Sequence, residues 1–354
     1  MRKVQFLLIV ACVMAVFCSN GAFAATKINI AGQGELASFP YWLAKERGWD
    51  KEEGLDINLL YFDSGMAMLN ALPSGEWHIG LAGAGLMGGL RYNTYIIGIC
   101  NDDAPANGIL VRADSPVMQH KGVNPAYPEA YGSAESIKGA TILTSTVSTA
   151  HFAVGRWLQA FGLSDKDVVL KNMDQAQVLA AFENKIGDAI GVWSPFLQIG
   201  QGKGWKKAAN GSQLGLGIGV WMMCDKAYGD KNPETVAKAL RVYMRGVRML
   251  REEPMETLLP VYKQFMTDWC GATLSDELMA QSIKDSPVLA YEEQLALFNA
   301  DKGMSKAQDW LTEFAKFFVE TKRITQADLD SIKGMPFATD AFLKKVQLPI
   351  PDYK

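Results

Sequence analysis

Residues 140–161 read ATILTSTVSTAHFAVGRWLQAF, which places a strand, a loop rich in hydroxyl groups and a helix in direct succession. Ala140–Thr144 has the length and apolar character of a buried strand. From Thr149 to Phe161 apolar residues recur every three or four positions, as in a helix with one buried face. A strand that leads directly into a helix is the unit of a parallel α/β sheet.

The same unit recurs on both sides of this stretch. Asp174, three residues before Gln177, resembles a capping box at the start of a further helix. After Pro233 the pattern is mostly helical to about Lys322. Helices alternate with the other expected strands, which are Lys27–Ala31, Asp56–Phe62, His78–Ala82, Tyr95–Cys100, Ile109–Ala113, Val168–Met173 and Asp188–Trp193.

This order predicts two α/β lobes, between which the chain crosses near Leu110 and again near Trp221. The polar, proline-containing stretch up to Ser136 is the best candidate for a linker. A chain of more than about 300 residues usually divides in this way. The expected division is residues 25–112 and 222–354 for lobe 1 with the C-terminal helices, and residues 113–221 for lobe 2.

The first 24 residues have the features of a secretory signal. They combine a basic start at Arg2 and Lys3, an apolar run, and the A-x-A cleavage site AFA at residues 22–24. The apolar run is too short for a membrane anchor, and the lipoprotein-like IVAC at residues 9–12 comes too early in it. We expect an exported, periplasmic protein without a lipid anchor.

Composition excludes several classes of function. The chain is 49% apolar and 21% charged, with a net charge of −3. A weakly acidic protein is a poor partner for nucleic acid or for an anionic membrane. Cys100, Cys224 and Cys270 follow the signal and form no C-x-x-C, so we expect no metal or redox site. They are either buried free thiols or one disulfide and one free thiol.

The loop of residues 144–149 carries five hydroxyl groups. A helix N-terminus offers unpaired N–H groups and about half a positive charge, and neighbouring hydroxyls add donors without a counter-charge. An ordinary helix cap needs only one such residue, so we expect this loop to hold an anion. His151, in the first helical turn, is expected to be neutral and without a catalytic partner.

Glycine and aromatic residues mark other parts of the expected cleft. GAGLMG at residues 83–88 matches a dinucleotide-binding pattern, but it follows the third strand rather than the first, so we expect no cofactor. Gly83 suits close approach of a small ligand or of a packed helix. Ser64 suits a helix cap or a ligand contact, while Trp193 and Trp221 stand at strand edges facing either the cleft or the core.

No catalytic motif occurs in the sequence. H-E-x-x-H, G-x-S-x-G and the P-loop pattern are absent, and the three histidines are far apart in the chain. We therefore expect a binding protein rather than an enzyme, with no cofactor and no metal.

Several motifs, taken in order, resemble those of periplasmic substrate-binding proteins for taurine, alkanesulfonates and nitrate. The resemblance implies a bilobal type 2 periplasmic-binding-protein fold, in which two α/β lobes are joined by two crossovers. It also implies a small anionic ligand in the cleft and delivery to the membrane permease and ATPase of an ABC importer. The motifs are YFDSG at 61–65, ALPSGEWHIG at 71–80, IKG at 137–139, STAHF at 148–152, GVWSPF at 191–196 and GVW at 219–221.

Positions that match the family's motifs predict ligand-binding residues. Ser148 and Thr149 match its hydroxyl pair, Gly83 and Ala84 its glycine loop, and Trp193 its cleft aromatic. We expect a monomer; a sensor module or an enzyme of the same fold is the alternative class. The full expected set is Gln33, Gly34, Ser64, Gly83, Ala84, Asn107, Thr146, Ser148, Thr149, Trp193 and Trp221.

The expected ligand is a small organosulfonate such as an alkanesulfonate or a taurine-like compound. Nitrate, bicarbonate, aromatic acids and pyrimidine precursors are the alternatives within the family. Taurine binders of the family carry an acid two residues before the last tryptophan, where this chain has Gly219. A ligand without an amine is then expected to bind tighter, unless Glu35 supplies a carboxylate at the far end of the cleft.

Overall fold

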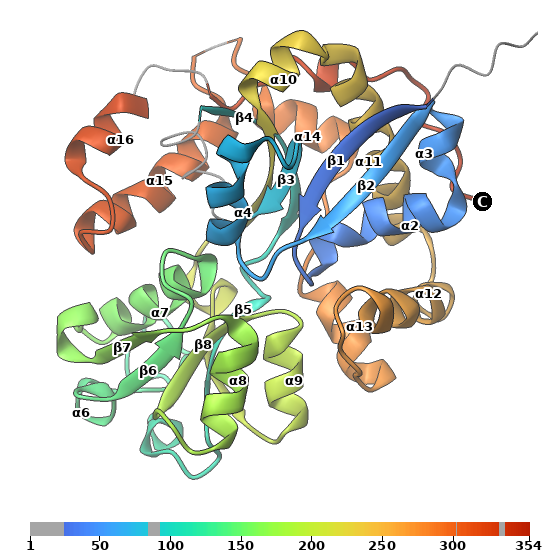
Figure 1. Ribbon diagram of the computed structural model, residues 1–354. Helices are drawn as coiled ribbons and strands as arrows, with labels where there is room; N and C mark the ends of the chain where they lie inside the picture. The colour runs from blue at the N-terminus through green and yellow to red at the C-terminus, as the bar shows by residue number, and fades with distance from the viewer. Residues whose placement is uncertain (1–24, 84–92, 302, 333–336) are drawn as a thin grey trace, which may run out of the picture.

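The computed structural model describes residues 25–83, 93–301, 303–332 and 337–354, so the expected signal sequence lies outside the described residues. Two five-stranded sheets form two lobes, each covered by helices (Figure 1). The bilobal α/β architecture is therefore as the sequence predicts. None of the described helices is long and apolar enough to cross a membrane.

The first sheet has the strand order β2-β1-β3-β10-β4. β1, β2 and β3 run parallel, whereas β10 lies between β3 and β4 and is antiparallel to both. Alternating Ile28 and Ile30 of β1 are fully buried, as the period-2 pattern requires. The strands are β1 Thr26–Gly32, β2 Leu55–Tyr61, β3 Ile79–Ala82, β4 Thr94–Asp102 and β10 Gly219–Asp225.

The second sheet repeats this topology with the order β7-β6-β8-β5-β9. β6, β7 and β8 run parallel, and β5 is antiparallel to β8 and β9. The antiparallel strand of each sheet is thus the one that follows a crossing of the chain. The strands are β5 Asn107–Val111, β6 Thr141–Thr144, β7 Val169–Asn172, β8 Ala189–Trp193 and β9 Lys206–Asn210.

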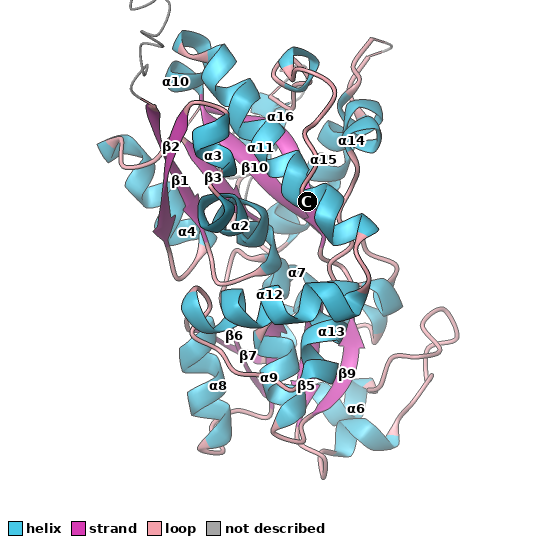
Figure 2. Ribbon diagram, turned by 90° about the vertical axis from the view of Figure 1, so that its right-hand side faces the viewer, coloured by secondary structure: helices cyan, strands magenta, loops and turns pink. Residues whose placement is uncertain are grey.

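Most helices of the first lobe come from the C-terminal part of the chain, and α12 and α13 lie at the junction of the lobes (Figure 2). Short 3₁₀ helices lie at Leu36–Ser38, Leu72–Ser74, Pro116–Gln119, Asp165–Asp167, Ser212–Leu214 and Leu343–Lys345. The α-helices are α2 Phe39–Arg47, α3 Trp49–Glu52, α4 Gly65–Ala71, α6 Ala134–Ile137, α7 Thr149–Ala160, α8 Gln175–Glu183, α9 Phe196–Gly202, α10 Lys226–Lys231, α11 Pro233–Glu252, α12 Met255–Asp268, α13 Asp276–Lys284, α14 Tyr291–Phe298, α15 Lys306–Glu320 and α16 Gln326–Ile332.

Two neighbouring segments, residues 103–106 and 211–218, join the lobes. They are hydrogen-bonded to each other, since the N–H of Asp103 donates to the carbonyl of Ile218 (2.5 Å). Because β5 pairs with β8 and β9, we place the first crossing before Asn107 rather than after residue 112. The return precedes Gly219. An apolar strand such as β5 suits either sheet, so its pattern alone could not assign it.

The proline-containing stretch before Ser136 is not a linker between the lobes, because it follows β5 and packs on the second lobe. The N–H of Tyr131 donates to Ala208 of β9 (2.7 Å), and its carbonyl accepts from Trp157 Nε1 of α7 (2.9 Å). The prolines of this stretch therefore indicate a surface loop of the second lobe and not a linker between the lobes. Cys100, Cys224 and Cys270 are free thiols, as the first of the two interpretations holds; Cys100 and Cys224 are buried, whereas Cys270 is only partly buried.

Candidate functional site

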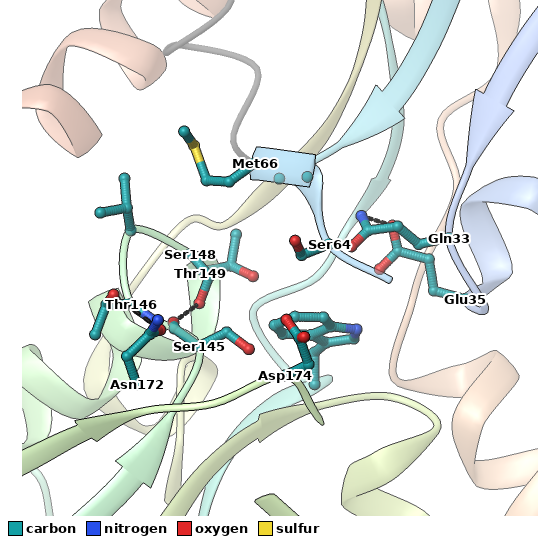
Figure 3. Close-up of a pocket in the computed structure, with 14 residues that line it drawn as sticks. Gln33, Glu35, Ser64, Met66, Ser145, Thr146, Ser148, Thr149, Asn172 and Asp174 are labelled. Carbon is teal, nitrogen blue, oxygen red and sulfur yellow. Dashed lines mark hydrogen bonds between the residues drawn. The ribbon is translucent and has the colours of Figure 1, made fainter. Parts of the chain in front are cut away.

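The carboxyl ends of the parallel strands of both sheets meet at one cavity between the lobes (Figure 3). Ligands of open α/β sheets bind at this edge. The cavity encloses about 110 Å³; since one water needs roughly 10–15 Å³, a small solute fits. Its lining is Gln33, Glu35, Ser64, Gly65, Met66, Gly83, Ser145, Thr146, Val147, Ser148, Thr149, Asn172, Asp174 and Trp193.

Most hydroxyl groups of residues 144–149 are already used within the second lobe. They stiffen the loop but have no hydrogen left for a ligand, so the loop offers fewer donors than its composition suggests. The hydroxyl of Thr144 donates to the carbonyl of Gly191 (2.9 Å), and that of Ser145 to the carbonyl of Met173 (2.8 Å). The hydroxyl of Thr146 donates to Asn172 Oδ1 (3.0 Å), and that of Ser148 to the carbonyl of Ser145 (2.6 Å).

Thr149 is different from its neighbours. Its side chain is only 6% exposed and lines the cavity, yet its hydroxyl has no hydrogen-bond partner among the described residues. The N–H groups of Thr149 and Ala150 are the first two of α7, where no intrahelical acceptor exists. These three donors, at the positive end of the helix dipole, are suited to an anion.

Ser148 and His151 hold the loop in place beneath these donors. Ser148 Oγ caps α7 by accepting the N–H of His151 (3.2 Å). The ring of His151 is fully buried, with Nδ1 accepting the N–H of Val147 (3.3 Å) and Nε2 3.1 Å from Asp165 Oδ2. His151 therefore has a carboxylate partner, contrary to expectation, but as a support of the loop. Val147 has a φ of 59°, a strained conformation for a β-branched residue.

Ser64 and Gly83 form part of the wall that the first lobe contributes. Ser64 Oγ caps α4 by accepting the N–H of Ala67 (3.2 Å), so Ser64 is a cap that also faces the cavity. Gly83, after β3, meets α7 across the cleft: a Cβ there would lie 2.4 Å from Thr149 Cγ2. The two lobes touch at this point only because residue 83 has no side chain.

Two buried polar side chains lie at the far end of the cavity from the hydroxyl loop (Figure 3). Gln33 Nε2 donates to Glu35 Oε1 (3.3 Å), and Gln33 Oε1 has no hydrogen-bond partner among the described residues. Burial, and to a smaller extent the carboxyl group of Asp103, raises the pKa of Glu35 well above its usual value.

Two further lining residues follow strands of the second lobe. The Trp193 side chain is 5% exposed and supplies apolar surface at the end of β8. Asp174 precedes α8 but makes no side-chain cap, so the expected capping box with Gln177 is wrong. Its exposed carboxylate instead faces the cavity.

Gly34 and Asn107, both predicted ligand contacts, do not line this cavity. A Cβ on Gly34 would lie 3.1 Å from the hydroxyl of Tyr61, so packing explains this glycine. Asn107 is fully buried at the first crossing, where its side chain donates to Asp103 Oδ2 (2.6 Å). Ala84 lies outside the described residues.

Trp221 also lies away from the cavity, although it was predicted to face the cleft. It is 2% exposed and packs edge-on against Trp310 and Phe298, with centroid distances of 5.4 and 6.3 Å. A Cβ on Gly219 would lie 2.7 Å from the Trp221 ring. An acid at residue 219 therefore has neither room nor access to the ligand.

Sequence reasoning left Asn172 and Asp174 out of the expected site. Both stand at the end of β7, next to the hydroxyl loop that ends β6. Parallel neighbours end at the same edge, so this adjacency was an available signal. The described residues contain no cluster of three or more histidine, cysteine or acidic side chains suited to a metal.

Comparisons with known proteins identify the family of this chain. The model of the NMT1-like family matches residues 26–257. A putative ABC transporter periplasmic binding protein of Brachyspira hyodysenteriae is 25% identical, over 93% of this chain and 95% of that protein. A putative aliphatic sulfonates-binding protein of Bacillus subtilis is 27% identical, over 71% of this chain and 75% of that protein.

A solved structure supports the fold. The periplasmic aliphatic sulphonate binding protein of Escherichia coli has a TM-score of 0.66 and 18% identity, over 86% of this chain and 96% of that one. The predicted periplasmic-binding-protein fold and the resemblance drawn from the six motifs are both confirmed.

Proposed function

Because the chain belongs to the NMT1-like family, we propose that it is the periplasmic solute-binding protein of an ABC importer. It holds a small organic anion, best a sulfonate, between its lobes, and it binds its solute without transforming it. It acts as a monomer that presents the loaded lobes to the permease and its ATPase. The names of the two relatives support this role.

The set of uncommitted donors at the start of α7 carries this proposal. Thr149, whose hydroxyl has no partner among the described residues, lines the cavity at the start of α7, where the N–H groups of Thr149 and Ala150 have no intrahelical acceptor. Trp193 adds apolar surface for the body of an organic anion.

We expect one small anion to bind per chain. In a thermal-shift screen against sulfonates, nitrate, phthalate and pyrimidines, a ligand at 100 times its dissociation constant should add about 2.7 kcal/mol of stability. Calorimetry should then give a stoichiometry of one, with the ligand recovered unchanged. Stabilisation by nitrate, phthalate or a pyrimidine alone would assign one of the alternative ligands, and a chemically altered ligand would contradict a binding role.

Thr149 and Ser148 should respond differently to substitution. Thr149→Val keeps the shape but removes the free hydroxyl, so affinity for the anion should fall by about 1.5–3 kcal/mol while the melting temperature is nearly kept. Ser148→Ala removes the cap and should mainly cost stability, by about 1 kcal/mol. Calorimetry and thermal melts of both variants check this; equal affinity losses would contradict the division of roles.

A further inference from the structure

The acceptor-rich end of the cavity carries an inference that rests on the proposed function and extends it. Glu35 and Gln33 are 7% and 5% exposed, and both line the cavity. Glu35 accepts one hydrogen bond, from Gln33, and Gln33 Oε1 accepts none among the described residues. Two buried acceptors thus face a space that the described part of the chain leaves open.

The surroundings of Glu35 contain no cation among the described residues. The titratable groups that interact electrostatically with it are acids, phenols and thiols, each of them neutral or negative. Among the described residues, the cavity lining includes two carboxylates and no lysine, arginine or histidine. These titratable groups are Asp103, Tyr61, Cys100, Tyr243, Tyr262 and Cys270.

A buried carboxyl without a cation is costly to ionise. An organic anion alone would make ionisation of Glu35 still more costly, because its charge would join that of Asp174 in the same cavity. A cationic nitrogen beside Glu35 removes the penalty. An ammonium has three hydrogens to donate, and the Glu35 carboxylate and Gln33 Oε1 are acceptors for them.

We propose that the cavity takes a small zwitterion, with its anionic group at Thr149 and the start of α7 and its protonated amine at Glu35 and Gln33. The labelled side chains lie in this order across the cavity, with Ser64 between the two ends (Figure 3). This reverses the preference expected from Gly219, because the carboxylate comes from the loop after β1 instead.

Binding of the amine is coupled to the proton of Glu35. The raised pKa favours the protonated carboxyl in the empty cavity, whereas pairing with an ammonium favours the carboxylate, so binding releases a proton to solvent at any pH where Glu35 starts out protonated. Affinity for a zwitterion should therefore rise with pH until it passes the pKa of Glu35. Burial also raises the pKa of Asp103 to about 7, so the part due to Glu35 is the difference between wild type and Glu35→Gln.

Two matched ligand pairs test the proposal by calorimetry: taurine against ethanesulfonate, and β-alanine against propionate. In at least one pair the amine-bearing member should bind the wild type at least ~10-fold tighter, as expected for a hydrogen-bonded charge pair. Glu35→Gln should abolish that preference and flatten the pH dependence. Asp63→Asn removes an exposed carboxylate outside the lining and should change neither.

Three outcomes would overturn the proposal. Equal or tighter binding of the amine-free members would do so while leaving the proposed function intact. A Glu35→Gln protein that keeps its preference for the amine would show that Glu35 acts as a neutral hydrogen-bonding group. Failure of all four compounds to bind would contradict both the zwitterion and the small organic anion.

Discussion

Replacing Phe317 by alanine should lower stability by about 3–5 kcal/mol, the usual cost of emptying a buried phenylalanine site. Phe317 is fully buried on α15 and contacts the rings of His151 and Phe152 on α7 at centroid distances of 5.6 and 5.0 Å. Gly155 lies so close that a Cβ there would be 2.3 Å from Phe317. Such a site is densely filled.

The effect should extend to both lobes, because α15 touches both. Trp310, near its start, packs against Trp221 of the first sheet, while Phe317 packs on the second lobe. A loss of this size corresponds to a melting temperature lower by roughly 4–7 °C for a chain of this length. Lys316→Ala is the control: its exposed pair with Glu313 contributes about 0–1 kcal/mol. If the melting temperature of Phe317→Ala lies within 2 °C of that of Lys316→Ala, the stabilising role of α15 in packing against both lobes is contradicted.

The sequence pattern predicts most elements of this fold because strand and helix periods depend on nearby residues. The pattern could not assign β5, since pairing with β8 or with β4 depends on where the chain goes next. The same limit applies to Trp221. A strand-end tryptophan faces the cleft unless something covers it, and what covers this one is Trp310, 89 positions later in the sequence.

In the candidate site, too, nearby residues could be predicted from the sequence, whereas contacts between distant residues could not. Seven of the predicted residues line the cavity, because the ends of parallel strands are visible in the pattern. Which hydroxyl is free is not visible, since the carbonyls that occupy the others belong to residues such as Met173 and Gly191, far along the chain. The environment of Glu35 was equally hidden, because its neighbours come from β2, β4, α11 and α12.

Gly83→Ala should weaken ligand binding by about 1–3 kcal/mol, the cost of an overpacked contact, which is roughly 5–150-fold in affinity. The added Cβ would lie 2.4 Å from Thr149 Cγ2, inside any tolerated distance. Gly83 does not have a positive φ, so the backbone itself accepts alanine. The clash arises between the lobes and disappears when they separate, so the unliganded variant should melt like the wild type.

A second substitution separates this contact from the hydrogen bonding of Thr149. Thr149→Ser removes the methyl group that Gly83→Ala would strike and keeps the hydroxyl. The double variant should therefore regain much of the lost affinity, and Thr149→Ser alone should lose little. Calorimetry supplies the four affinities of this cycle, and small-angle scattering shows whether ligand still draws the lobes together. If Gly83→Ala binds as tightly as wild type, the contact at residues 83 and 149 does not limit closure.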